Sequence, residues 1–197
     1  MNDAKTITDF LFYAEKLKTE YRLASKSDGL RESVADHCWS LSLLLMLVAP
    51  KLTIELDLLH ALKMVIVHDL VEVEAHDVPI LDHIVSEDGQ REKEEKELAA
   101  MESIQEKLGE MGDDIYTLWR EYEAQQTVEA RVVKALDRLD GQLQFLNENV
   151  TTFKASHGPA IEALLAQTTK LAQIDPLIAE IDVITMGLRK RRIASAA

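Results

Sequence analysis

The sequence predicts an all-α fold, and three observations lead to that prediction. Apolar residues recur at helical spacing in most segments, and Val132, Val133, Leu136 and Leu139 are a clear example. No segment shows the convincing alternation of apolar and polar residues that a half-buried strand requires. The chain has 197 residues, of which 47% are hydrophobic, so it is long enough for a single domain with a substantial core.

Composition and charge exclude several classes of function. A net charge of -13 opposes general nucleic-acid binding, and an aromatic content of 5% opposes a base-stacking surface. The single cysteine, Cys38, cannot form an intrachain disulfide and fits a reducing cytosol. The sequence shows no signal peptide, and the apolar run 41–49 is too short to cross a bilayer. We therefore expect a cytoplasmic protein that binds neither nucleic acid nor a membrane.

The first two helices are placed by their caps and breaks. Asp3 or Thr8 is the expected cap of a helix that reaches about Tyr21. Its buried side would consist of Phe10, Leu11, Ala14 and Leu17. Residues 25–29 have the composition of a loop, and a second helix begins near residues 31–33 and stops before Pro50. Residues 41–48 are apolar on nearly every side, which predicts a central buried helix.

A third helix, with Thr53 as its candidate cap, should end at His68 and Asp69. A long loop from Pro79 to Gly89 follows, and long loops in compact domains are often functional. The remaining helices are expected at residues 90–108, 113–122, 128–149, 158–173 and 176–191. Charges at helical spacing in 90–108 indicate a solvated face, and Thr127 is the expected cap of 128–149.

Side chains suited to metal binding occur in three separated places, namely His37, the pair His68 and Asp69, and Asp137. Asp137 lies inside an apolar stripe, where a carboxylate must be paired or bound to a cation. One alternative is therefore an ion pair of Asp137 with a nearby Arg131, Lys134 or Arg138, with ordinary interior histidines. The other is a mixed nitrogen and oxygen site, which suits Mn, Fe, Co, Ni or Zn.

Three stretches resemble the HD-domain metal-dependent phosphohydrolases, specifically the branch similar to 5'-deoxynucleotidases. They are residues 32–39 (ESVADHCW), 63–72 (KMVIVHDLVE) and 134–139 (KALDRL), and their order matches the family's His, His-Asp and Asp pattern. The resemblance covers roughly residues 10–147. It implies a single HD-type helical bundle over residues 1–197, with C-terminal helices at about 158–191 outside the metal-site core.

The resemblance also implies roles for individual residues. One divalent metal ion would be held by His37, His68, Asp69 and Asp137. Glu72 matches the family's acid/base position, and Asp77 matches a carboxylate near the substrate sugar and water. From the sequence alone, without the resemblance, two solvated loop acids are the favoured explanation. Arg22 matches the residue that holds the substrate phosphate, and a surface salt bridge is its simpler explanation. His60 and His83 match no family role.

The sequence departs from the family pattern at three positions. His76 stands where the family usually has glycine, and its ring would narrow the pocket or add a ligand or proton carrier. Leu23 and Ala24 follow Arg22 where close deoxynucleotidases have a tryptophan that helps to exclude ribose. This puts the deoxyribose preference in doubt. Asp36 precedes His37 where glutamate is common.

We therefore expect a phosphomonoesterase that acts on a small nucleotide-like substrate. Two other classes remain open: a non-catalytic metal-containing nucleotide or metabolite sensor, and a plain helical interaction module. The resemblance favours a homodimer. The apolar C-terminal helix, with Ile178, Ile181 and Ile184, would either cover the core or form the dimer surface.

Overall fold

The computed structural model describes residues 2–76, 86–147 and 157–196, and these are helical apart from one short hairpin. The elements of the N-terminal half are α1 (Asp3–Ala14), η1 (Glu15–Lys18), β1 (Tyr21–Ser25), β2 (Arg31–Ser33), α2 (Val34–Val48), η2 (Ala49–Lys51), α3 (Leu58–Val67) and α4 (Glu72–Ala75). Those of the C-terminal half are α6 (Glu87–Leu108), α7 (Glu110–Ala124), α8 (Val128–Phe145), α9 (Gly158–Ala172) and α10 (Pro176–Ala196). The predicted all-α class is confirmed.

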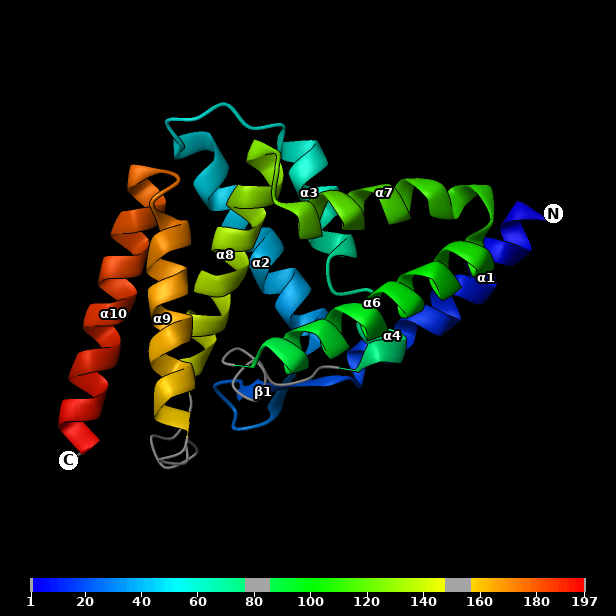
Figure 1. Cartoon of the computed structure of the whole chain (residues 1–197). Coiled ribbons are helices and arrows are strands. Elements are labelled where there is room, and N and C mark those ends of the chain that lie inside the picture. Colours follow the sequence, from blue (N-terminus) through cyan, green and yellow to red (C-terminus); the bar gives the residue numbers. More distant parts are fainter. Residues whose placement is uncertain (1, 77–85, 148–156, 197) are drawn as a thin grey trace.

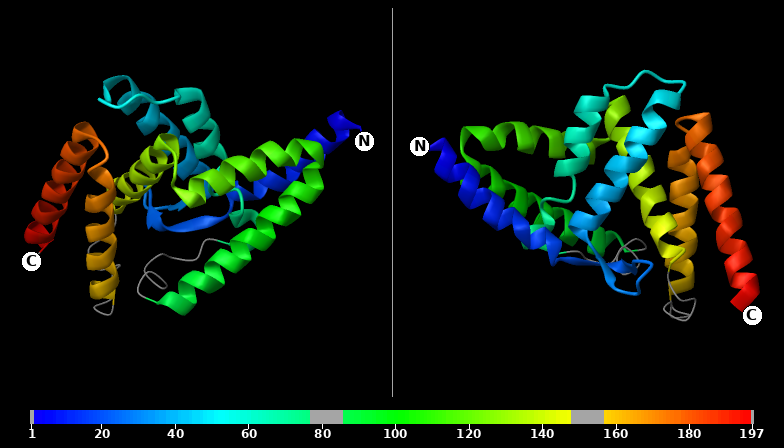
Figure 2. Two further views of the ribbon diagram at one scale, coloured as in Figure 1. Left: turned by 45° about the horizontal axis from the view of Figure 1, so that its top comes forward. Right: turned by 180° about the vertical axis from the view of Figure 1, so that it is seen from behind.

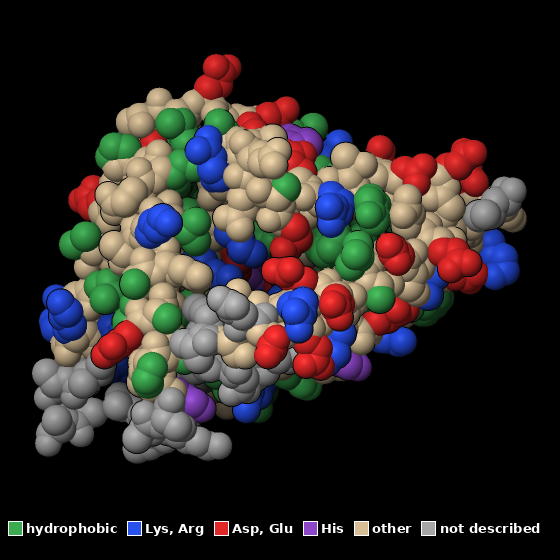
Figure 3. Space-filling view, in the orientation of Figure 1, with side chains coloured by type: hydrophobic (Ala, Val, Ile, Leu, Met, Phe, Trp, Pro, Cys, Tyr) green, Lys and Arg blue, Asp and Glu red, His purple; other side chains and the backbone are tan. Residues whose placement is uncertain are grey.

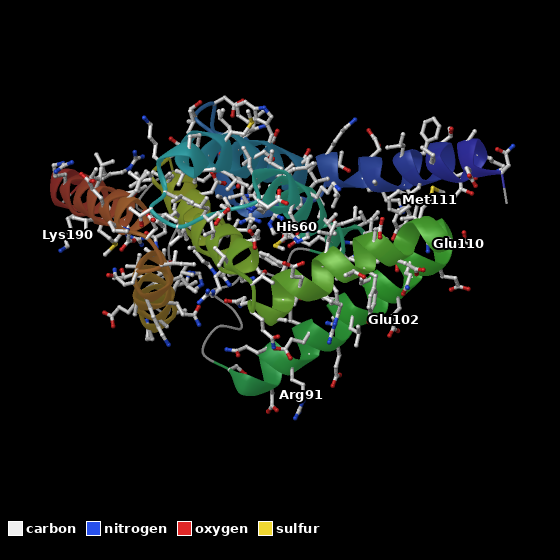
Figure 4. All side chains as sticks on the ribbon, turned by 90° about the horizontal axis from the view of Figure 1, so that it is seen from above. His60, Arg91, Glu102, Glu110, Met111 and Lys190 are labelled. Atoms are coloured by element: carbon white, nitrogen blue, oxygen red, sulfur yellow. The ribbon has the colours of Figure 1, made fainter. Side chains whose placement is uncertain are left out.

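Helices α2 and α8 pack against each other in the middle of the molecule (Figures 1 and 2). The antiparallel pair α9 and α10 lies at one end, and α6 and α7 form a long hairpin toward the other, where α1 packs on α6. In the view from above, Glu110 and Met111 mark the tip of this hairpin, and Arg91 and Glu102 point away from the body (Figure 4).

Buried apolar side chains form two main clusters on either side of the end of α3. The first includes Leu41, Met64, Leu136 and Ile178, from α2, α3, α8 and α10. The second includes Val67, Met101, Ile104 and Trp119, from α3, α6 and α7. Residues at the end of α3 therefore lie between two rigid, water-excluding bodies, which is where charged side chains can be held in fixed positions.

The start of α2 is fixed by a capping box. The Ser33 hydroxyl accepts from the Asp36 backbone N–H, and the Asp36 carboxylate accepts from the Ser33 backbone N–H. Asp36 also accepts from Lys26 Nζ at 3.1 Å. The unusual aspartate before His37 thus serves as the N3 partner of Ser33 in the capping box, and His37, the next residue along α2, is fully buried.

The N-terminal caps differ from the sequence prediction in two places. Asn2, rather than Asp3 or Thr8, caps α1. Asp57 caps α3, because its side chain accepts from the His60 backbone N–H, whereas the Thr53 backbone N–H and hydroxyl both donate to Asp175. In both helices the residue just before the first turn is the cap, and at α3 a tertiary contact to Asp175 engages Thr53 instead.

Some apolar residues that the sequence places in the core lie at the surface. On α1, Leu11 is 65% exposed, and on α2 Leu47 is 66% exposed, so neither helix is buried as predicted. Trp39 is also exposed, in contrast to Trp119, which is buried between α6 and α7. Leu11, Trp39 and Ile66 line one surface groove together. The N-terminal part of the molecule therefore carries an apolar face that its own described residues leave uncovered.

The structure contains a two-stranded sheet that the sequence did not predict. Strand β1 pairs antiparallel with β2, with Tyr21 opposite Ser33, where a helix end and a loop were predicted. Gly29 lies in the connecting turn with φ +82°, a conformation that favours glycine. The hairpin holds Arg22 and Leu23 against α8 and α9. It is the element that places these side chains near the cluster described below.

The later helices follow the prediction closely. Thr127 caps α8 through the Ala130 backbone N–H, and Trp119 and Tyr122 of α7 are buried. Helix α6 begins at Glu87, inside the segment predicted as loop, because Ser86 caps it. Ile178 is buried, whereas Ile184 is 54% exposed, so α10 both covers the core and keeps an outer apolar face. None of the described helices is long and apolar enough to cross a membrane.

Candidate metal centre

Four predicted ligands from three helices meet between the two apolar clusters. His37 comes from α2, His68 and Asp69 end α3, and Asp137 lies in the middle of α8. One ligand atom from each of His37, His68 and Asp69 lies within 4.8 Å of the others. Asp137 Oδ1 is 3.2 Å from His37 Nε2, and Asp69 Oδ2 is 3.2 Å from His68 Nε2. We call these four residues the His/Asp cluster.

The outer nitrogen of each imidazole ring is already engaged. His37 Nδ1 lies 2.8 Å from Asp140 Oδ2, and Asp140 in turn accepts from Ser40 Oγ at 2.5 Å. His68 Nδ1 lies 2.8 Å from the Val65 carbonyl oxygen. A nitrogen that donates to an oxygen fixes the tautomer, so in the neutral rings both Nε2 atoms are left as acceptors facing the cluster.

These two Nε2 atoms are buried and lack a hydrogen-bond partner of good geometry among the described residues. A buried polar atom without a partner is costly. Two imidazole nitrogens beside two carboxylates form a donor set that a divalent cation satisfies. The residues therefore fit a metal ion, with Asp140 and Val65 as the groups that orient its histidine ligands.

Asp137 is held by Tyr122, a residue that the sequence did not pair with it. Tyr122 donates its hydroxyl to Asp137 Oδ2 at 2.8 Å, and Lys134 Nζ donates to the same hydroxyl at 2.9 Å. Lys134 also lies over the Tyr122 ring, 4.1 Å from its centroid. The direct ion pair with Arg131, Lys134 or Arg138 is thus replaced by an indirect link through a tyrosine, which leaves Oδ1 facing the histidines.

Electrostatics in the cluster favour a bound cation. Burial and the nearby Arg22 act to lower the pKa of His37, but the Asp137 and Asp140 carboxylates raise it to about 9. Burial acts to raise the pKa of Asp69, yet His68 and Arg22 hold it well below its usual range. Burial also acts to raise the pKa of Asp137, but His37 and Arg138 hold that pKa well below its usual range. Two ionised carboxylates thus hold a positive charge on His37, and a divalent ion would take its place.

A second group of three potential ligands, Glu32, His37 and Asp140, is less suited to an ion. Arg22 Nε lies 3.3 Å from Glu32 Oε2, and Asp140 is occupied by His37 and Ser40. Burial raises the pKa of Glu32, which opposes its ionised form. These residues act as supports around His37.

A pocket opens onto the His/Asp cluster between β1, α6, α7, α8 and α9. It is lined by Arg22, Leu23, Ala24, His68, Asp69, Glu72, Lys93, Glu97, Tyr122, Glu123, Lys134, Asp137, Arg138, Gly141, Gln142, Phe145 and Leu164. Basic and acidic side chains gather around a hollow between α8 and α6 (Figure 3). Among the lining residues four are basic and five acidic, so one divalent ion would make this pocket cationic in a chain of net charge -13.

Arg22 reaches the pocket from β1. Its Nη1 lies 3.0 Å from Asp69 Oδ2, and only 19% of its side chain is exposed. Arg22 thus forms ion pairs, as its simpler explanation predicts, but these are partly buried at the pocket and do not lie on the open surface. Gly141 on α8 lies beside Arg22, since a Cβ there would be 3.9 Å from Arg22 Nη2, an ordinary contact distance.

The structure describes Glu72, one of the two predicted acid/base residues, but not Asp77. Glu72 begins α4, is 6% exposed and lines the pocket, so it is not a solvated loop acid. Asp77 and His83 lie outside the described residues. His60 is 2.8 Å from Glu121 Oε2 and is absent from the lining of this pocket, in keeping with a structural role.

His76 explains why glycine is common at its position in the family. Its backbone has φ +61° and ψ 148°, a region that L side chains rarely adopt. The ring is exposed, lies 3.1 Å from Glu20 Oε2 and is absent from the pocket lining. The structure thus gives no support to His76 as a pocket ligand or as the group that narrows the pocket.

Comparison with known proteins agrees with this geometry. The family model described as HD domain matches residues 14–176. The chain belongs to the HD domain family. The solved structure of a predicted metal-dependent phosphohydrolase from Magnetospirillum magnetotacticum has a TM-score of 0.77 and 25% identity, over 98% of this chain and 97% of that one.

Curated relatives of this HD domain share the description 5'-deoxynucleotidase. The chain is 36% identical over 144 residues to 5'-deoxynucleotidase HDDC2 of Dictyostelium discoideum, which covers 69% of the chain and 74% of that relative. It is 36% identical over 116 residues to 5'-deoxynucleotidase HDDC2 of Xenopus laevis, over 58% of the chain. The second match spans only about half of the relative, 54% of its length.

Sequence reasoning missed several residues of the HD-domain site. Neither Asp140 nor Tyr122 is among the site residues that the sequence predicts. Arg138 and Gln142 of α8 also line the pocket. The spacing of Arg138 and Gln142, one helical turn apart and next to Asp137 and Gly141, was the available signal.

Proposed function

We propose that this chain is a metal-dependent phosphohydrolase that removes phosphate from a nucleoside 5'-monophosphate. The observation that carries the proposal is the His/Asp cluster, in which two buried Nε2 atoms and two carboxylates face one point at the edge of a pocket lined by both basic and acidic side chains. The 5'-deoxynucleotidase name of the relatives agrees with it.

In this proposal His37, His68, Asp69 and Asp137 hold one divalent ion, which is Mn, Fe, Co, Ni or Zn because the donors are nitrogen and oxygen. When bound, such an ion lowers the pKa of a coordinated water and polarises the phosphoryl oxygens. Asp140 and Val65 keep the two imidazoles in the ligating tautomer, and Tyr122 keeps Asp137 aimed at His37.

Three further residues handle the substrate. Arg22 offers a planar fork of donors beside Asp69, which suits a phosphate oxygen pair. Glu72, one helical turn after His68 and largely buried, moves a proton to or from the water or the leaving oxygen. Asp77 is proposed, from the family resemblance, to contact the sugar and water.

The structure suggests two properties of the whole molecule. We propose that residues 1–197 act as one domain, since α8 packs against α2, α3, α7, α9 and α10. We also propose a homodimer formed through the exposed apolar face that includes Leu11, Trp39 and Ile66. Light scattering of the wild type and of Trp39→Glu tests this, because a dimer through that face should dissociate in the variant.

The decisive experiment measures phosphate release from a panel of 5'-ribonucleotides and 5'-deoxynucleotides after chelation and resupply of Mn, Co, Ni, Zn or Mg. We expect turnover only with metal. An Asp182→Asn variant, which changes a buried carboxylate between α9 and α10, serves as the control for folding. Stoichiometric metal with nucleotide binding but no phosphate release would favour the sensor. Absence of metal uptake would refute both and favour a helical interaction module.

A further inference from the structure

The pocket has two chemically different ends along α8. Its lining positions on this helix are 134, 137, 138, 141, 142 and 145, which recur at the spacing of one helix face. The cluster end contains Lys134 and Asp137. The far end contains Gln142 and Phe145 of α8 together with Leu23, Ala24 and Leu164. Asp137 and Phe145 are about 12 Å apart along the helix axis, at 1.5 Å per residue.

Gln142 is the polar exception at the far end. It is 3% exposed, and neither its Oε1 nor its Nε2 has a hydrogen-bond partner among the described residues. Neighbouring Gln144, in contrast, donates from Nε2 to the Ser25 carbonyl oxygen. A buried carboxamide with both atoms unpaired is unfavourable, and such a group is expected where a ligand supplies the partners.

The far end suits a flat ring with a hydrogen-bonding edge. Phe145, Leu164 and Leu23 supply apolar surface, and a carboxamide supplies one acceptor and two donors side by side. Every common nucleobase has an adjacent donor and acceptor on one edge, and adenine pairs with glutamine in this bidentate manner. The phosphate would lie at the cluster end beside Arg22, so the base of a nucleotide would extend toward Gln142.

We propose that Gln142 recognises the hydrogen-bonding edge of the nucleobase, an inference that rests on the proposed nucleotidase function. Because a carboxamide can turn over to exchange its donor and acceptor, Gln142 accepts several bases and selects for the presence of a base edge. Gln142 is thus a specificity residue, separate from the side chains that act on phosphate.

The test compares dAMP with 2-deoxyribose 5-phosphate, which lacks a base, in the wild type and in Gln142→Leu. We expect kcat/KM for dAMP to fall about 10-fold or more, as for one or two lost hydrogen bonds. The value for 2-deoxyribose 5-phosphate should change less than about 2-fold. The control is Gln173→Leu, an exposed glutamine at the end of α9, which should change neither value.

Each outcome separates the two proposals. Equal losses on both substrates, or no loss on dAMP, would overturn the role of Gln142 and leave the nucleotidase function standing. Absence of turnover by the wild type on any nucleotide would refute the nucleotidase function itself. If Gln142→Leu does not fold, the wild type is given a 2-deoxyribosyl benzene 5'-phosphate, whose ring has no hydrogen-bonding edge. A kcat/KM equal to that of dAMP would then refute the role of Gln142.

Discussion

At the cluster end of the pocket each candidate ligand is held by a second protein group, whereas Gln142 at the far end has none among the described residues. Asp140 orients His37, the Val65 carbonyl orients His68, Arg22 contacts Asp69 and Tyr122 donates to Asp137. Only the cluster end is therefore organised before a ligand arrives.

This difference separates two tasks. Groups that stabilise a transition state must be fixed in advance, because reorganisation during the reaction costs rate. Groups that select a substrate gain discrimination by remaining unsatisfied until the correct partner binds. Changes at the cluster end should thus abolish metal binding or turnover, and changes elsewhere should alter substrate preference or stability only.

The largest effect is expected for Asp137→Ala at the cluster end. The change removes a ligand carboxylate and leaves buried imidazoles without charge balance, so both metal uptake and thermal stability should fall. Turnover should drop by more than the roughly 10²–10⁴-fold that loss of an acid/base group costs. Metal analysis after gel filtration is the measurement. One equivalent of metal bound with unchanged affinity would show that the ligand assignment is wrong.

Glu72→Ala should retain the metal and the fold but lose most turnover, by about 10²–10⁴-fold. The reason is that Glu72 lines the pocket next to the cluster without belonging to it. Phosphate release and metal content are measured on the same sample, and Glu72→Gln provides the matched variant of equal size. A fully active Glu72→Ala enzyme would move the acid/base role to Asp77.

Asp140→Asn tests whether the support behind His37 matters. An amide in place of the carboxylate weakens the hold on the imidazole, and such outer partners typically contribute 10–100-fold in metal affinity or activity. We expect a loss of that size in metal affinity, measured by competition with a chelator. Asp182→Asn is the control, since its carboxylate is equally buried but accepts from Thr169. Equal losses in both variants would indicate a general loss of stability.

Discrimination between dAMP and AMP should be modest. Leu23 and Ala24 line the pocket after Arg22, where close relatives have a bulky aromatic, and Trp39 is 69% exposed and absent from the lining. A pocket without that steric block rejects an added hydroxyl poorly. We expect a kcat/KM ratio below about 100, or under roughly 2.7 kcal/mol. A ratio in the thousands would mean that another side chain closes the 2' position.

The smallest kinetic effect is expected for His76→Gly, which belongs to neither end of the pocket. Glycine adopts the positive φ at this position without strain. This gain should outweigh the loss of the exposed contact between His76 and Glu20. We expect a gain of about 1 kcal/mol in the free energy of unfolding, with kcat/KM unchanged. Denaturant unfolding provides the measurement, with Ala75→Gly as the control. A large kinetic change would bring His76 back into the mechanism.

Helical periodicity and the family motifs predicted the helices and the four cluster residues, because both signals are local in the sequence. The hairpin of β1 and β2 was not predicted, because strands of five and three residues are too short to show alternation of apolar and polar residues. The partners Tyr122 and Asp140, and the unpaired state of Gln142, depend on how α7 and α8 pack. No spacing within one helix determines them.

The His/Asp cluster also has a consequence for the order of folding. His37 and its support Asp140 are 103 residues apart, and His68 and Asp69 are the only two proposed ligands that adjoin in the chain. No single segment therefore offers more than two ligands. Bringing α2, α3 and α8 together has an entropic cost that increases with the length of chain enclosed. We infer that the ion binds late in folding, after these helices have packed. It then cross-links three helices that are already in contact.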